Sequence, residues 1–215
     1  MRTEIFGIFP TPILKLRFDR SFTQTELDFL LKSEEDVTKP PFAIHLGNST
    51  TESKRLLENP ELADIKDYLE KCLDQWCKQV MMPISPEAFK LKITQSWINY
   101  TKPGEHHDRH YHPNSIVSGV LYVSADKEHD MITFSKNSNE PFYIQPGQFN
   151  HFNSGEVNIT VDKYDIILFP STVGHHVPPT TTNNTRISLA FNTFFQGQIG
   201  HPNDLPNYLE IHSVR

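Results

Sequence analysis

Four of the chain's eleven histidines fall within seven positions of the segment GEHHDRHYHPNS, residues 104–115. They are His106, His107, His110 and His112, and Asp108 stands among them. A second group, His175 and His176, occurs in FPSTVGHHVPP. Neutral imidazole is the commonest metal-binding side chain. The two windows therefore predict a metal site, although solvated polar turns and histidines that cap a strand end would give the same pattern.

The spacing within the first window favours ligands if that segment is extended. Residues two apart in a strand point to the same side. One face would then carry His106, Asp108, His110 and His112. Two ligands at i and i+2, with a third from a distant strand, can occupy one face of an octahedron. We expect His175 to be that third ligand, in a loop at the mouth of a barrel after the apolar strand at residues 166–169.

A second chemical feature is the segment RISLAFNTFF, which begins at Arg186. One face of such a strand carries Arg186, Ser188, Ala190 and Asn192, and the other carries Ile187, Leu189 and Phe191. A guanidinium binds a carboxylate through two hydrogen bonds, and a hydroxyl two residues along can add a third. Arg186 and Ser188 therefore look like a carboxylate anchor inside a barrel. The alternative is a structural salt bridge to one of the 26 acidic residues.

Hydrophobic periodicity predicts the elements that position these residues. Alternation at residues 13–18 predicts an early strand, and the Thr23-x-x-Glu26 capping box predicts a short helix that starts near Thr23. Apolar residues at three- and four-residue spacing between residues 60 and 79 predict a longer helix that packs on a sheet. Strand-like segments follow at residues 89–100, 116–124, 131–135, 157–161, 165–170 and 186–195. Strands in succession without helices predict antiparallel pairing in a sandwich, jelly roll or barrel.

Length and composition are those of one mainly β (α+β) domain, residues 1–215. We divide it into an N-terminal strand and helices (1–85), a β core (86–200) and a C-terminal tail (201–215), with residues 136–155 as a loop or lid. A formal net charge of -6 argues against nucleic acid as a partner. No apolar run predicts a signal peptide or a membrane span, so we expect a cytoplasmic protein. Cys72 and Cys77 predict neither a disulfide nor a zinc site.

The histidine and arginine segments together resemble a known family. The stretches SWINYTKPGEHHDRHYHPNSIVSGVLYVS, DIILFPSTVGHHV and TRISLAFN are similar to the 2-oxoglutarate/Fe(II) oxygenases found in bacteria and marine phages. The shared motifs are W-x-N, H-x-H-P-x-S-x-x-S-G-x-x-Y, F-P-S followed by H, and R-I-S followed by F-N. The resemblance covers roughly residues 95–195 and implies a double-stranded β-helix, a jelly roll of the cupin type, with the N-terminal helices packed on one sheet.

Carried over to this sequence, the resemblance implies that His110, His112 and His175 bind Fe(II). It also implies that Arg186 and Ser188 bind the distal carboxylate of 2-oxoglutarate, with Asn99 and Tyr122 as further cosubstrate residues. The remaining motif positions are Trp97, Ser115, Ser118, Gly119 and Asn192. The implied activity is hydroxylation of a substrate with O2 while 2-oxoglutarate is converted to succinate.

One departure from the superfamily leaves alternatives open. The common triad has two histidines and one carboxylate, whereas His112 stands where Asp or Glu is usual. Asp108 could supply the carboxylate, or His106 and Asp108 could be the near pair. With three neutral ligands, the protein could also be a cupin-type dioxygenase that does not use 2-oxoglutarate, or a non-catalytic jelly roll that binds metal and a carboxylate.

The substrate and the oligomeric state do not follow from the sequence. A protein side chain, a peptide and a small molecule all remain candidate substrates, and strand edges could pair in a homodimer. If the gene belongs to a phage, the expected location is the cytoplasm of the host cell.

Overall fold

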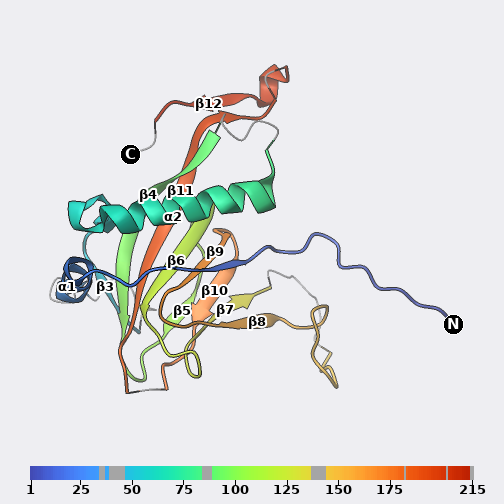
Figure 1. The fold of residues 1–215 in the computed structure, drawn as a ribbon. Helices are drawn as coiled ribbons and strands as arrows, with labels where there is room; N and C mark the ends of the chain where they lie inside the picture. The colour runs from blue at the N-terminus through green and yellow to red at the C-terminus, as the bar shows by residue number, and fades with distance from the viewer. Residues whose placement is uncertain are drawn as a thin grey trace.

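Two antiparallel sheets form the body of the protein (Figure 1). The computed structural model describes residues 1–33, 37–38, 47–83, 89–136, 144–181, 183–201 and 203–213. The larger sheet has the strand order β1 (Leu14–Arg17), β9 (Asp165–Pro170), β6 (Val117–Ser124), β11 (Arg186–Ile199), β4 (Phe89–Thr101), β3 (Ser49–Thr51) and β2 (Val37–Thr38), with β12 (Leu209–Ile211) beside β11. The smaller sheet has the order β5 (His107–His110), β10 (Gly174–Val177), β7 (Met131–Ser135) and β8 (Glu156–Thr160). This arrangement confirms the mainly β, double-stranded β-helix prediction.

Helices cover the outer face of the larger sheet. Helix α1 (Gln24–Lys32) begins with the predicted capping box, in which the Thr23 hydroxyl and the Glu26 carboxylate each accept a hydrogen bond from the other residue's backbone N–H. Helix α2 (Ala63–Trp76) lies across the strands of this sheet (Figure 1) and buries one stripe of side chains against it: Ile65, Leu69, Cys72, Leu73 and Trp76. Short helical turns flank these elements: η1 (Leu56–Glu58) and η2 (Pro60–Leu62) before α2, η3 (Cys77–Met81) after it, and η4 (Leu205–Asn207) before β12. The prediction that the longer helix packs on a sheet is confirmed.

Two apolar clusters form the core, one on each side of the larger sheet. Strand β9 contributes to both, because Ile166 and Leu168 face the helices while Ile167 and Phe169 face the smaller sheet. Strand β11 is divided in another way. Its Ile187, Leu189 and Phe191 pack in the cluster under the helices, while Arg186, Ser188 and Ala190 face the space between the sheets. The predicted division of β11 into two faces is therefore confirmed, and its polar face lies where a site can form.

All six predicted strands of the C-terminal half are present, with boundaries that differ by a few residues. The strands β3, β5, β10 and β12 were not predicted as such, and each has only three or four residues. The expectation that His175 lies in a loop is wrong, because it lies in β10, paired with His110 of β5 and Phe134 of β7. Of the expected loop at 136–155, residues 137–143 lie outside the described part. Residues 144–155 contain no helix or strand.

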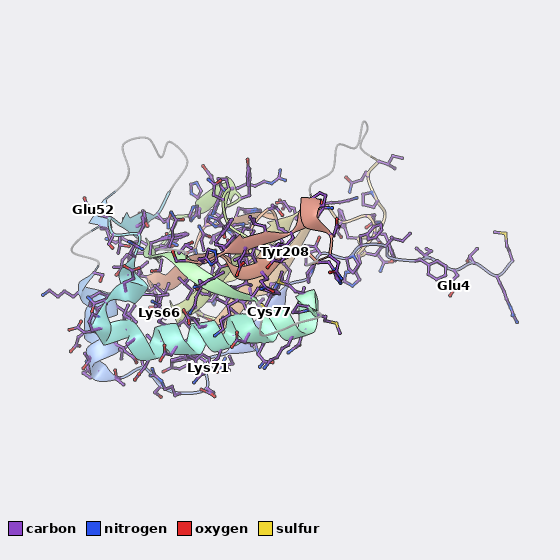
Figure 2. The ribbon with its side chains drawn as sticks, turned by 90° about the horizontal axis from the view of Figure 1, so that it is seen from above. Glu4, Glu52, Lys66, Lys71, Cys77 and Tyr208 are labelled. Atoms are coloured by element: carbon purple, nitrogen blue, oxygen red, sulfur yellow. The ribbon has the colours of Figure 1, made fainter. Side chains whose placement is uncertain are left out.

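The N-terminal residues before β1 extend away from the body, and Glu4 lies far out on this segment (Figure 2). No helix among the described residues is both long enough and apolar enough to cross a membrane.

Candidate metal centre

Three histidine side chains converge in the space between the two sheets. His110 ends β5, His175 is the second residue of β10, and His112 follows in the turn after β5. One ring nitrogen from each lies within 4.8 Å of the others. Pairing of His110 with His175 across the β5–β10 ladder sets two of the rings. The backbone N–H of His112 donates to the Ser171 carbonyl at 2.9 Å, which fixes the turn that carries the third.

The hydrogen bonds of two rings fix which nitrogen is free. His110 Nδ1 lies 2.7 Å from the Asp108 carbonyl oxygen, and His175 Nδ1 lies 3.0 Å from the Val173 carbonyl oxygen. A carbonyl oxygen only accepts, so each Nδ1 must carry the proton and donate it. The lone pair is then on Nε2 in both residues. Histidine ligands of metals commonly have this arrangement, in which the second ring nitrogen donates to a backbone carbonyl.

Burial keeps the rings in the neutral form that binds metals. Desolvation, reinforced by the neighbouring imidazoles, lowers the pKa of His175 to about 3 and that of His112 to about 4. Burial also lowers the pKa of His110, and the hydrogen bond to the Asp108 carbonyl opposes this shift only in part. The three imidazoles are therefore uncharged at neutral pH, with no proton to be displaced when a cation enters.

The expected common face of residues 106, 108, 110 and 112 is not observed. Strand β5 contains an irregularity, because His110 pairs with His175 while His107, three residues earlier, pairs with Val177 only two residues later. This bulge brings His107 into the pocket, where its ring stacks on that of His110 with centroids 4.2 Å apart. His106 and Asp108 instead contact each other, with His106 Nε2 3.2 Å from Asp108 Oδ1, and both are partly exposed. Neither belongs to the converging group.

Arg186 lies in the same pocket and is 4 % exposed. The one hydrogen bond that its side chain makes within the described residues runs from Nη2 to Thr101 Oγ1 at 3.1 Å. The nearest carboxylate is Asp130, 3 % exposed, with Oδ1 3.8 Å from Nη1. A charge-assisted hydrogen bond would be about 1 Å shorter, and Asp130 Oδ1 has no hydrogen-bond partner in the part of the chain that the structure describes. Asp130 thus balances the charge of Arg186, as the salt-bridge alternative supposed. It is too far away to accept a hydrogen bond, so the guanidinium N–H groups that face it can donate to a second carboxylate.

The strand ladders gather the other predicted cosubstrate residues around Arg186. Ser188 of β11 pairs with Asn99 of β4 on one side and with Tyr122 of β6 on the other. All three side chains line the pocket. Tyr122 is fully buried, and desolvation raises the pKa of its phenol, so that it remains a neutral hydrogen-bond donor. The pocket end around Arg186 therefore combines one cation with neutral donors, which is a setting for a carboxylate.

Several motif residues form a buried network of side-chain hydrogen bonds next to the site. The Ser171 hydroxyl contacts those of Ser115 at 2.7 Å and Ser118 at 2.8 Å, and Ser118 donates to Asn192 Oδ1 at 2.8 Å. Because the Ser171 carbonyl holds the His112 backbone, this network supports the turn that carries a candidate ligand. Gly119 is required by close packing, since a Cβ there would lie 2.1 Å from Phe191 Cζ.

Four polar residues in or beside the pocket were not identified as site residues from the sequence. Asn48, Thr101, His107 and Asp130 lie in or beside the pocket. Asn48 and Asp130 lie in polar segments that read as turns, and Thr101 is the unremarkable end of a strand. Only His107 belonged to a notable cluster, and strict alternation excluded it because that pattern does not anticipate a bulge.

Comparison with known proteins decides the family. Residues 95–192 match the family model described as "Putative 2OG-Fe(II) oxygenase". This segment belongs to the 2OG-Fe(II) oxygenase family. It contains all three converging histidines and Arg186, so the oxygenase segment and the site coincide. Among functionally curated proteins, none matches the sequence.

Solved structures share the fold of this chain. A prolyl-4-hydroxylase from Pseudomonas putida is 15% identical, with a TM-score of 0.53 over 85% of this chain and 92% of that one. A Trichoplax adhaerens prolyl hydroxylase, in complex with a hypoxia inducible factor peptide fragment, is 16% identical, with a TM-score of 0.56 over 85% and 83%. HygX from Streptomyces hygroscopicus, with nickel, 2-oxoglutarate and hygromycin B bound, is 14% identical, with a TM-score of 0.55 over 85% and 82%.

The family uses Fe(II), 2-oxoglutarate and O2, and the residues present fit these groups. Three neutral imidazoles whose ring nitrogens lie within 4.8 Å of one another suit a divalent transition metal. The open fork of Arg186 and the neutral donors beside it suit a carboxylate. Both features lie in one pocket between the sheets, as a metal-chelating 2-oxo acid with a distal carboxylate requires.

Proposed function

We propose that this protein is an Fe(II)- and 2-oxoglutarate-dependent dioxygenase that hydroxylates a C–H bond of its substrate. One oxygen atom of O2 enters the product, and the other enters the succinate formed, with CO2, from 2-oxoglutarate. The observation that carries the proposal is that a three-imidazole cluster lies in the same pocket as a buried arginine whose guanidinium can still bind a carboxylate. Either feature alone would be compatible with a structural role.

Each residue has a definite task in this reaction. His110, His112 and His175 would hold Fe(II) through neutral nitrogens, and the carbonyl groups of Asp108 and Val173 keep two of the rings oriented. When bound, the metal supplies the oxidising chemistry with O2 and the 2-oxo acid, and the protein supplies placement.

The cosubstrate is placed by the other end of the pocket. Arg186 would bind its distal carboxylate, and the Ser188 hydroxyl, two residues along the same strand face, adds a donor. Asn99 and Tyr122 flank Ser188 on the neighbouring strands and complete the wall. Burial excludes water from around Arg186, which strengthens its interaction with a carboxylate.

The three-histidine cluster is the feature that separates this site from the common triad. The converging group that the described residues form contains no carboxylate. Neutral ligands would leave the charge of Fe(II) unbalanced by the protein, so the anionic 2-oxo acid is the first group able to balance it. This feature equally suits a three-histidine dioxygenase that does not use 2-oxoglutarate, and the experiment has to distinguish the two activities.

An anaerobic titration of metal-free protein with Fe(II) and then 2-oxoglutarate tests the proposal. A chelated 2-oxo acid gives a visible metal-to-ligand charge-transfer band. We expect the band in the wild type, its loss in His175→Ala, and a weaker cosubstrate affinity in Arg186→Ala. Truncating one side of a buried charge pair costs about 2–4 kcal/mol, or roughly 30- to 1,000-fold in Kd. Arg109→Ala, an exposed arginine of β5, is the control and should leave the affinity unchanged.

One outcome would overturn the proposed function, and another would overturn the role of Arg186. If Fe(II) binds and no band forms, the site does not chelate a 2-oxo acid, and O2 uptake without 2-oxoglutarate would then identify a three-histidine dioxygenase. If the band forms equally in Arg186→Ala, the carboxylate anchor is wrongly assigned. Formation of succinate and CO2 from 2-oxoglutarate in the presence of O2 is the measurement that completes the test.

A further inference from the structure

One polar side chain in the pocket has no hydrogen-bond partner among the described residues. Asn48, the residue before β3, is 1 % exposed and lines the pocket that contains the three histidines and Arg186. Neither its Oδ1 nor its Nδ2 makes a hydrogen bond with any residue that the structure describes. A buried amide without partners is costly, and most such groups in folded proteins are paired. Asn48 lies outside the segment that matches the oxygenase family model, so the family match says nothing about its role.

The strand ladders place Asn48 close to the cosubstrate anchor. In β3, Ser49 pairs with Tyr100 and Thr50 pairs with Asn99. Continuing this register by one residue sets Asn48 beside Thr101, which pairs with Arg186 and accepts its hydrogen bond. Gly47 lets this segment approach β5, because a Cβ there would lie 2.7 Å from His106 Nδ1. Asn48 is thereby held at the side of the pocket that lies next to Thr101.

The chemistry of the amide selects the kind of ligand. Asn48 offers one acceptor and two donor hydrogens, and all are unused. The functional groups of 2-oxoglutarate, two carboxylates and a ketone, only accept hydrogen bonds at neutral pH, so the cosubstrate could satisfy Nδ2 but not Oδ1. A ligand that satisfies both atoms must carry a donor and an acceptor side by side. A primary or secondary amide has this arrangement, and it meets a carboxamide in a paired, two-hydrogen-bond geometry.

We propose that Asn48 is a specificity-determining residue that binds an amide group of the substrate, so that the substrate class is a peptide or a carboxamide. This inference rests on the proposed oxygenase function, because it identifies the substrate of the same pocket. A site built to hydrogen-bond a substrate group discriminates strongly against analogues that lack it, since the protein's own polar atoms are then left buried and unpaired.

The first test uses three small probes of equal heavy-atom number: acetamide, acetate and acetone. The side-chain NH2 signal of Asn48, assigned by its disappearance in Asn48→Leu, is followed in the NMR spectrum of the full-length, metal-free protein. We expect acetamide to shift this signal more than acetate or acetone does, because acetate and acetone can pair only with Nδ2 whereas acetamide pairs with both Nδ2 and Oδ1. We also expect ligand-observed binding of acetamide to weaken at least tenfold in Asn48→Leu. Equal responses to the three probes, or no response to acetamide, would overturn the proposal.

The second test separates a binding role from a structural one. Leucine has nearly the shape of asparagine and no polar atom, so Asn48→Leu should raise the melting temperature if the amide is unpaired in the free protein. Asn192 is the matched control, since it is also buried but is hydrogen-bonded to Ser118 and Gln95. Asn192→Leu should lower the melting temperature. A fall of similar size in both variants would show that Asn48 is structural.

The charge-transfer titration distinguishes this inference from the proposed function. Asn48→Leu should keep the affinity for 2-oxoglutarate within about twofold, because the anchor residues are intact. A tenfold loss of 2-oxoglutarate affinity would make Asn48 a cosubstrate residue and would refute the inference while leaving the oxygenase in place. If the wild type forms no band, the oxygenase proposal fails, and the acetamide response alone decides whether the pocket binds amides.

Discussion

Acidification should destabilise the metal-free protein, and the buried histidines should account for a defined part of the loss. Burial lowers the pKa of His175 to about 3 and that of His112 to about 4 in the folded protein. A histidine in the unfolded chain has a pKa of about 6.5. As the pH falls below about 6.5, the unfolded chain therefore takes up protons that the folded protein excludes, and stability decreases until the folded-state pKa is reached.

The magnitude follows from the distance between the two pKa values. A pH of 5 is about 1.5 units below the pKa of a histidine in the unfolded chain, so that histidine is protonated while the folded one remains neutral. At about 1.36 kcal/mol per unit, each residue then lowers the free energy of unfolding by about 2 kcal/mol. At pH 7 the same contribution is only about 0.2 kcal/mol. His175 and His112 together should therefore cost about 4 kcal/mol between pH 7 and pH 5, a large fraction of the 5–15 kcal/mol that is typical of a domain.

Urea unfolding of the chelator-treated protein at pH 7, 6 and 5 measures this loss. In His175→Gln the decrease in the free energy of unfolding from pH 7 to pH 5 should be smaller than in the wild type by about 2 kcal/mol, because glutamine does not titrate. His201→Gln, a substitution on the exposed surface, controls for the change of one imidazole. If His175→Gln follows the wild-type pH dependence within about 0.5 kcal/mol, His175 is not held neutral by burial, and the argument for a preformed neutral metal site is wrong.

Three further substitutions test packing and support. Gly119→Ala places a methyl group against the Phe191 ring and should lower the free energy of unfolding by about 1–3 kcal/mol, measured in urea; an unchanged midpoint would contradict the close contact. Leu69→Ala removes a fully buried side chain of α2 and should cost about 2–5 kcal/mol by thermal unfolding, whereas a loss below about 1 kcal/mol would mean that the helix is only loosely packed. Ser171→Ala breaks the hydroxyl network under His112 and should cost about 1–2 kcal/mol and weaken zinc binding in a competition titration; unaltered zinc affinity would show that the network does not position His112.

Much of the fold could be predicted because it depends on periodic patterns. The alternation in β11 identified both its core face and its polar face, and the stripe on α2 identified the residues that pack on the sheet. The short strands β3, β5 and β10 could not be predicted in this way, because three or four residues are too few to establish a period. They become strands through pairing with neighbours that lie far away in the sequence.

The site could be predicted only where residue type and motif were informative. His110, His112 and His175 do converge, and Arg186, Ser188, Asn99 and Tyr122 do share their pocket, while their roles remain proposals. Asn48 was missed because its significance is that its buried amide has no hydrogen-bond partner among the described residues. Asp130 was missed because its significance is its distance of 3.8 Å from Arg186. A sequence shows which groups are available, but whether each group finds a partner depends on the three-dimensional arrangement.

The bulge in β5 bears on how related chains should be aligned and how this one could be shortened. His107 and His110 are three positions apart, yet they pair with residues only two positions apart on β10. One residue between them therefore has no partner position in the β5–β10 pairing. A chain without the exposed Arg109 would carry the same two rings at positions two apart, on one face of a regular strand. Relatives of different length in this segment should therefore be superimposed by ring position instead of by counting from the first histidine.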